Sequence, residues 1–123
     1  MEAGRQLMKN NKYEKPSICI FCSSEIKDTS NFSDLFFGIE EEGIPYEIKR
    51  KKESDASKLS YRAAQESRLA VGIGIHKSGE IALTFNKLKK DEPLFSAHLN
   101  SGENILRNLG ANAGRLVKGI SFK

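Results

Sequence analysis

Two cysteines with the spacing C-x-x-C are the first residues in this sequence that suggest chemistry. Cys19 and Cys22 could form a redox pair or half of a zinc site, because both use this spacing where the two sulfur atoms converge on a turn or helix start. Here the pair lies inside the apolar run Ile18–Cys22, which is typical of a strand buried on both faces. Residues three apart in a strand point to opposite faces, and no second cysteine pair exists. We therefore interpret both cysteines as core residues.

Gly72 and Gly74 could belong to a phosphate-binding loop, since glycines let a backbone approach a phosphate closely. A dinucleotide-binding fingerprint also needs a third glycine and a helix directly after it, whereas the residues after Gly74 predict a β-hairpin. We predict instead that these glycines form a smooth sheet face against which a helix packs closely. Gly110 and Gly114, four residues apart on the last predicted helix, are the expected matching face.

Other candidates for catalysis or phosphate binding are sparse. His76 and His98 lie in predicted turns or loops, without a carboxylate or cysteine at ligand spacing. The sequence contains no nucleophile elbow, no P-loop and no acid/base pair. The basic run at residues 49–52 and the pair Lys89–Lys90 could contact phosphates, but only 8% of residues are aromatic and Trp is absent, so no base-stacking platform is evident. We predict no catalytic residue, and a solvated loop at the basic run.

The most informative residues are the three consecutive glutamates Glu40–Glu42. They lie in the last turn of a predicted helix, where the helix dipole disfavours each anionic side chain by roughly a few tenths of a kcal/mol. At 100° per residue, Glu41 points away from the core in line with Asp34 and Phe37, whereas Glu40 and Glu42 flank the core face. Two interpretations follow: a solvated acidic helix end, or a docking face whose carboxylate is available to a partner's cation or metal.

The helix that carries these glutamates is predicted by hydropathy patterning. Apolar residues at i, i+3, i+4 and i+7 from Phe32 indicate a helix over residues 31–42. Ser30 or Asn31 is the expected N-cap, and Gly43 is the expected left-handed residue after the helix.

The remaining predicted elements alternate along the chain. Besides the strand at Ile18–Cys22, we predict strands at residues 46–49, 69–75 and 81–85, and helices at residues 59–67 and 101–118. Residues 87–100 are predicted to form an irregular connection. This order predicts an α/β fold: a single three-layer domain with helices on both faces of a small, mostly parallel sheet.

Length and composition fit one domain. The chain has 123 residues, of which 38% are hydrophobic and 29% charged, enough for a globular core. We divide it into a flexible polar N-terminus at residues 1–16 and a single domain at residues 17–123. No apolar run approaches the roughly 20 residues of a membrane span, and the polar first residues indicate no secretory signal. We therefore expect a cytoplasmic protein without a membrane partner, and the net charge of +4 does not by itself indicate nucleic acid.

Several motifs, taken together, resemble one family. They are Gly-Ile-Glu-Glu-Glu-Gly-Ile-Pro, Ser-Tyr-Arg-Ala-Ala, Leu-Ala-Val-Gly-Ile-Gly, Arg-Asn-Leu-Gly-Ala-Asn-Ala and Arg-Leu-Val-Lys-Gly-Ile, at residues 38–45, 60–64, 69–74, 107–113 and 115–120. In this order they are similar to the small (beta) subunit of diol/glycerol dehydratase reactivase, and the resemblance spans roughly residues 18–122. The chain departs from the family pattern in its longer polar N-terminus, in Gly114 instead of Ala, and in Ser121 instead of Pro.

This resemblance implies the non-catalytic subunit of a chaperone-like reactivating factor. In the family the large subunit is an ATPase, and the small subunit is similar in fold to the medium subunit of the adenosylcobalamin-dependent diol dehydratase. An inactivated dehydratase retains damaged cobalamin, which escapes when the small subunit leaves the factor and the medium subunit takes its place. The implied partners are the large subunit, in a heterotetramer of two large and two small subunits with ATP on the large subunit, and indirectly the dehydratase.

The resemblance also implies a metal contact. In the family, a glutamate of the segment at residues 38–43 reaches a Mg²⁺ ion that the large subunit holds. By position and by its outward direction, this residue is Glu41 here. The predicted partner-binding residues are Asp34, Phe37 and Glu41, and we expect the chain alone to bind no cofactor.

Three other functions stay open. The chain could be the medium subunit of a cobalamin-dependent dehydratase, although that subunit is normally longer than 123 residues. The charge of +4 permits a basic RNA-binding domain of the α/β anticodon-binding type, and a flavodoxin-like nucleotide binder is disfavoured by the missing phosphate loop. The sequence does not distinguish glycerol from propane-1,2-diol dehydratase as the client, and leaves open the oligomeric state of the isolated chain and any association with a bacterial microcompartment.

Overall fold

The computed structural model describes residues 15–52 and 55–123, so the flexible terminus predicted at residues 1–16 lies almost wholly outside the described residues. The strands are β1 (Ile18–Ser23), β2 (Tyr46–Lys51), β3 (Val71–Ile75), β4 (Glu80–Phe85) and β5 (Phe95–His98). The α-helices are α2 (Ser33–Glu41), α3 (Ala56–Glu66) and α4 (Glu103–Lys118), with short 3₁₀ turns at Ser30–Phe32 and Leu99–Ser101. No helix of this described part is long and apolar enough to cross a membrane.

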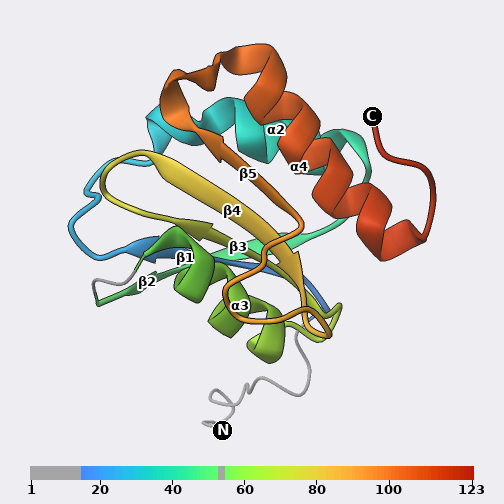
Figure 1. Cartoon of the computed structure of the whole chain (residues 1–123). Coiled ribbons are helices and arrows are strands. Elements are labelled where there is room, and N and C mark those ends of the chain that lie inside the picture. Colours follow the sequence, from blue (N-terminus) through green and yellow to red (C-terminus); the bar gives the residue numbers. More distant parts are fainter. Residues whose placement is uncertain (1–14, 53–54) are drawn as a thin grey trace, which may run out of the picture.

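The five strands form one sheet in the order β2-β1-β3-β4-β5 (Figure 1). Strand β1 pairs parallel with both β2 and β3, whereas β3–β4 and β4–β5 are antiparallel. Helix α3 covers one face of the sheet, and α2 and α4 lie side by side over the other (Figure 1). The predicted three-layer α/β domain is confirmed.

Strand β1 is buried on both faces, as its continuous apolar sequence predicts. Ile18, Ile20 and Cys22 join the larger core beneath α2 and α4, whereas Cys19 and Phe21 pack against α3 on the other face. The two cysteines therefore lie on opposite faces of the sheet, and the prediction that both are core residues is confirmed. Burial raises the pKa of the Cys22 thiol, which keeps it protonated and unreactive.

Gly72 and Gly74 face α3, and the predicted close helix packing is confirmed. A Cβ atom on Gly72 would overlap the Ser60 carbonyl oxygen and the Ala64 amide nitrogen, and one on Gly74 would overlap the backbone of Ala56 and Ser60. The matching surface is therefore the backbone of α3. The prediction that Gly110 and Gly114 match these strand glycines was wrong, because both lie on the opposite layer, against α2 and the residues after it.

Other differences from the predicted elements have local causes. Residues 95–98 form a fifth strand that sequence patterning missed, because four residues are too few to show alternation. Its antiparallel pairing makes the sheet evenly mixed instead of mostly parallel. Arg50 and Lys51, predicted as part of a solvated loop, instead extend β2 beyond the predicted end at Lys49, at the sheet edge, where charged side chains are common.

The predicted caps of α2 were right at one end only. Helix α2 begins at Ser33 after a 3₁₀ turn, and neither Ser30 nor Asn31 caps it with a side chain. Asp28 instead accepts a hydrogen bond from the Ser30 amide at 2.9 Å. At the other end, Gly43 has a φ of +74°, as predicted for the left-handed position.

The Gly72–α3 contact predicts a loss of stability without a specific loss of binding. We expect Gly72→Val to lower the free energy of unfolding by roughly 1–3 kcal/mol or more, because the added methyl groups overlap helix backbone that cannot give way. Urea unfolding measures this, with Gly43→Asn as the control: nothing lies within 4 Å of a Cβ there, and Asn tolerates the left-handed conformation. A Gly72→Val protein of unchanged stability would contradict the packing assignment.

Candidate functional site

The outward stripe of helix α2 is the surface that sequence analysis singled out. Leu35, Phe36 and Ile39 bury the inner face of the helix in the core. On the opposite side, Asp34, Phe37 and Glu41 follow one another at helical spacing, with exposed fractions of 28% and 44% for the two carboxylate side chains and 45% for Phe37. The structure therefore brings the three predicted partner-binding residues together on one exposed stripe.

An arginine from helix α4 joins this stripe. Arg107 donates from Nη1 to Glu41 Oε2 at 3.2 Å and from Nη2 to Asp34 Oδ1 at 3.1 Å. Its guanidinium carbon lies 5.6 Å from the centre of the Phe37 ring, within cation–π range. We call Asp34, Phe37, Glu41 and Arg107 the Arg107 cluster. It carries two negative charges and one positive, so it presents a net charge of about −1 beside an exposed aromatic ring.

The position of Arg107 follows from glycines that let α2 and α4 approach closely. A Cβ on Gly38 would overlap the Arg107 carbonyl oxygen and lie 2.7 Å from the Ala111 amide nitrogen. A Cβ on Gly110 would overlap the Leu35 carbonyl oxygen. Gly38 stands between Phe37 and Glu41, so the same contact that joins the helices places Arg107 over the acidic stripe.

The neighbouring glutamates have structural partners. Glu40 accepts a hydrogen bond from the Tyr46 hydroxyl at 2.9 Å. The Glu42 side chain is only 9% exposed and pairs with Lys118 Nζ at 2.7 Å and Arg115 Nε at 3.1 Å. The hydrogen bond from Lys118, with a smaller one from Arg115, lowers the pKa of Glu42. Glu42 therefore links the end of α2 to the end of α4 through ion pairs, whereas Glu41 points outward.

Sequence analysis missed Arg107 as a member of the site, although it quoted the motif that begins with it. A signal was present: Gly38 and Gly110 each break the apolar face of a helix, as expected where two helices touch. Pairing these glycines places the residue three before Gly110 next to Gly38, and that residue is Arg107.

The described residues of this chain contain no cluster of typical metal ligands. No group of three or more His, Cys, Asp or Glu side chains within 15–52 and 55–123 is arranged to bind a metal ion. The Glu41 carboxylate uses Oε2 for Arg107 and is largely open to solvent. It fits the part of a single ligand that completes a metal shell supplied by another chain.

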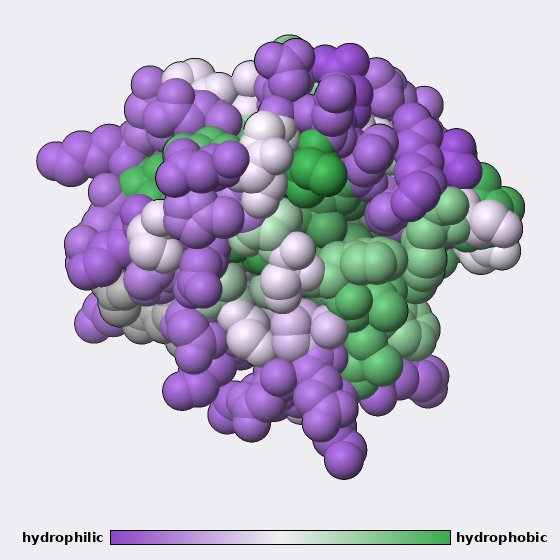
Figure 2. Space-filling model, turned by 45° about the horizontal axis from the view of Figure 1, so that its top comes forward, coloured by the Kyte–Doolittle hydropathy of each residue, from purple (hydrophilic) through white to green (hydrophobic). Residues whose placement is uncertain are grey.

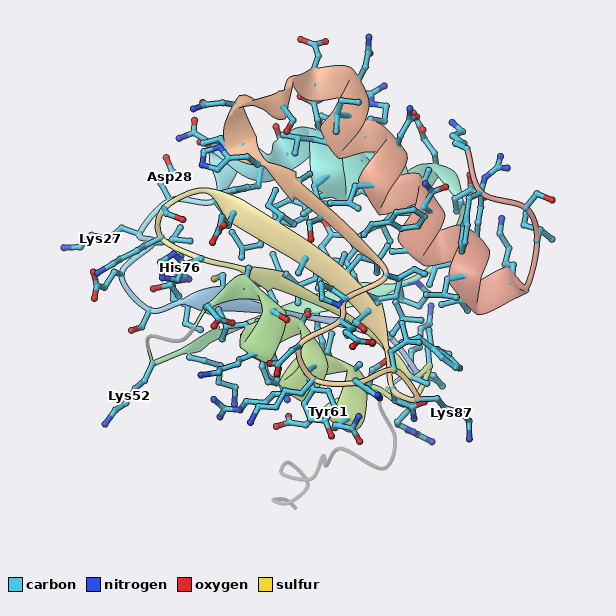
Figure 3. All side chains as sticks on the ribbon, viewed as in Figure 1. Lys27, Asp28, Lys52, Tyr61, His76 and Lys87 are labelled. Carbon is cyan, nitrogen blue, oxygen red and sulfur yellow. The ribbon has the colours of Figure 1, made fainter. Side chains whose placement is uncertain are left out.

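The other chemically suggestive side chains lie apart from this cluster. His76 stands at the β3–β4 turn, where its ring Nδ1 lies 2.9 Å from the Ser78 hydroxyl (Figure 3). Lys52 and Lys87, which flank the two basic stretches of the sequence, lie at opposite edges of the molecule in Figure 3. These two basic stretches thus do not form one continuous phosphate-binding surface.

Exposed hydrophobic side chains gather on the layer that carries the Arg107 cluster. The large ones within the described residues are Phe37, Ile105, Ile120 and Phe122, which belong to α2, α4 and the tail after α4. Figure 2 brings this layer forward and shows hydrophobic surface framed by hydrophilic side chains. The opposite layer, formed by α3, contributes none of them.

Comparison with known proteins identifies the family. The model of the dehydratase medium subunit family matches residues 15–123. The small subunit of a probable glycerol dehydratase-reactivating factor from Citrobacter freundii is 38% identical over 108 residues, which is 87% of this chain and 92% of that protein. The propanediol dehydratase-reactivating factor small subunit of the same species is 36% identical and covers 88% of this chain and 90% of its own length. The chain belongs to the family of dehydratase-reactivating factor small subunits.

Solved structures of this family have the same fold. A chain of glycerol dehydratase reactivase matches with a TM-score of 0.85 at 38% identity, over 89% of this chain and 97% of that chain. A chain from a diol dehydratase-reactivating factor complexed with ADP and Mg²⁺ matches with a TM-score of 0.82 at 31% identity, over 89% and 99%. The resemblance found in the sequence motifs is confirmed. The names of these small subunits agree with a non-catalytic role.

The ion pairs of Glu42 with Arg115 and Lys118 predict a pH-dependent contribution to stability. Because the folded pKa of Glu42 lies below its ordinary value of 4.5, its contribution is present above that pH and is lost as the pH falls through the folded pKa. We expect Glu42→Gln to melt at a lower temperature than the native chain at pH 7, and the difference to shrink as the pH is lowered below 4.5. Thermal unfolding over a series of pH values measures this, with Glu40→Gln as the control. A difference independent of pH would contradict the assigned ion pairs.

Proposed function

We propose that this chain is the non-catalytic small subunit of a reactivating factor for diol or glycerol dehydratase. It binds a large ATPase subunit and takes part in releasing damaged cobalamin from the inactivated enzyme by subunit exchange. The observation that carries the proposal is the exposed Asp34–Phe37–Glu41 stripe on a chain that spans nearly the whole of the reactivase small subunits. This stripe lies outside the chain's own core, with the Phe37 ring 45% exposed.

Subunit exchange is supported by the family itself. The model that matches residues 15–123 describes the dehydratase medium subunit, while the relatives are small subunits of reactivating factors. One fold thus serves both kinds of subunit, so each is suited to occupy the same place on a common partner. The assembly we propose contains two large and two small subunits, acts in the cytoplasm, and carries ATP on its large subunits.

Glu41 is the residue that we propose to reach the metal of the large subunit. A related reactivating factor was solved with ADP and Mg²⁺, so nucleotide and metal occur in such assemblies. Mg²⁺ prefers hard anionic oxygens and is commonly bound by one or two carboxylates together with phosphate and water. The Glu41 side chain is 44% exposed at the end of α2, which suits a ligand donated across a subunit interface.

The client is proposed only at the level of a chemical class. The relatives' names mention glycerol, propanediol and diol dehydratases at similar identity, so the client is a dehydratase of short vicinal diols or glycerol. The medium subunit of such a dehydratase is the second candidate function, because the matching family model carries that name. Binding of cobalamin by the purified chain would favour that second function, and we expect none.

The proposed metal contact predicts a magnesium-dependent loss of binding. We expect Glu41→Gln to keep the native melting temperature and to bind the large subunit roughly tenfold or more weakly with magnesium present, because an amide cannot supply the charge. Without magnesium, the difference should be small. Calorimetry on the complex measures both affinities, after co-expression and pull-down establish the partner. Glu40→Gln is the matched control, since that carboxylate is engaged by Tyr46. Equal, magnesium-independent effects of both variants would indicate a diffuse acidic patch and overturn the ligand assignment.

The exposed ring of Phe37 predicts a second kind of loss. Phe37→Ala should weaken docking by roughly 1–2 kcal/mol, about 5- to 30-fold, through lost apolar burial at the interface. The loss should be the same with and without magnesium, because the Phe37 ring binds no metal ion and the Asp34 ion pair still holds Arg107. The same calorimetric series measures it. An unchanged affinity for Phe37→Ala would place the α2 stripe outside the interface.

A further inference from the structure

Arg107 is the member of the cluster to which neither the sequence motifs nor the comparisons give a role. Its backbone is fixed, because its carbonyl oxygen lies against Gly38 where α2 and α4 touch. Its guanidinium group pairs with Asp34 at 3.1 Å and lies 5.6 Å from the centre of the Phe37 ring. The Asp34 ion pair does not involve Glu41, so it restrains the guanidinium group independently of Glu41.

Arg107 hydrogen-bonds to one oxygen of each of the two carboxylates. Arg107 binds Oε2 of Glu41 and Oδ1 of Asp34, one oxygen of each. The planar guanidinium fixes the directions of both bonds at once, which the flexible ammonium of a lysine cannot do. Glu41 is thus oriented through one oxygen, and its second oxygen is left for a metal ion.

Electrostatics decides whether such an arginine helps or hinders a cation. A guanidinium group alone would repel Mg²⁺ from the adjacent carboxylate. Here the Asp34 carboxylate, 3.1 Å from Nη2 and less exposed than Glu41, neutralises the guanidinium. An approaching cation therefore meets a neutral Asp34–Arg107 pair and the negative charge of Glu41. Arg107 therefore orients the Glu41 carboxylate without repelling the metal ion.

We propose that Arg107 is a positioning residue that holds Glu41 for the metal of the large subunit, and that Asp34 acts by neutralising Arg107. This inference rests on the proposed function, since it assumes that Glu41 meets a metal there. Groups that hydrogen-bond to a metal-binding carboxylate typically change metal affinity by about 10- to 100-fold when removed. The effect of Arg107 should therefore appear in the magnesium-dependent part of docking.

The test is the ratio of affinities for the large subunit with and without magnesium, measured by calorimetry on the complex. Arg107→Met keeps an unbranched side chain over Phe37, and we expect it to reduce this ratio about tenfold. Arg107→Lys should recover only part of the loss, because it cannot bond both carboxylates in fixed directions. Arg115→Met is the matched control: it removes an arginine of the same helix that pairs with Glu42, so it should lower the melting temperature without changing the ratio.

A double-mutant cycle with Glu41→Gln separates this inference from the proposed function. If Arg107 acts through Glu41, Arg107→Met changes the ratio by less than about twofold in the Glu41→Gln background. If Glu41→Gln lowers the ratio and Arg107→Met leaves it unchanged or raises it, the inference is overturned while the metal contact stands. If neither variant alters the ratio, both fail together. Full additivity of the two changes would also overturn the inference, because Arg107 would then contact the partner independently.

Discussion

The backbone contact between helices α2 and α4 is the constraint on which the rest of this surface depends. Gly38 and Gly110 leave no room for a side chain, so the two helices meet through main-chain atoms and hold a single register. That register places Arg107 over Asp34, Phe37 and Glu41, and places Arg115 and Lys118 against Glu42. A side chain at either glycine would separate the helices and dissolve both sets of ion pairs. The stripe that we propose for docking is thus a consequence of helix packing and not of a loop.

The same contact supplies partners for two of the three glutamates at the unfavourable end of helix α2, and strand β2 supplies the partner of the third. Each is disfavoured there by the helix dipole, yet each has a cationic or hydroxyl partner supplied from elsewhere in the fold: Tyr46, Arg107, or Arg115 with Lys118. The Glu42 side chain is nearly buried and its partners lower its pKa, so its ion pairs stabilise the folded state. Glu41 stays open at the surface and keeps its charge available. Adjacent glutamates differ in burial and partners because successive residues point 100° apart around the helix.

Much of this arrangement was predictable from the sequence, and the remainder was not for identifiable reasons. Buried strands, the α2 face and the outward direction of Glu41 follow from periodicity, which depends only on neighbouring residues. The sequence predicted that a helix packs closely on Gly72 and Gly74, but not that this helix is α3. Glycine spacing indicates that a close approach occurs, but not which element approaches. The β5 strand was too short to show alternation. Arg107 was missed because its meaning depends on a contact with residues 66 to 73 positions away.

The central claim is that the α2 stripe docks on a metal-bearing subunit through Glu41. A crystal structure of this chain bound to its large subunit with ADP and Mg²⁺ tests it most directly. The account predicts a Glu41 carboxylate oxygen about 2.0–2.1 Å from Mg²⁺, with Arg107 still bonded to the other oxygen and Phe37 buried in the interface. A complex in which the α2 stripe faces solvent, or in which Glu41 lies outside the coordination shell of the metal, would contradict it.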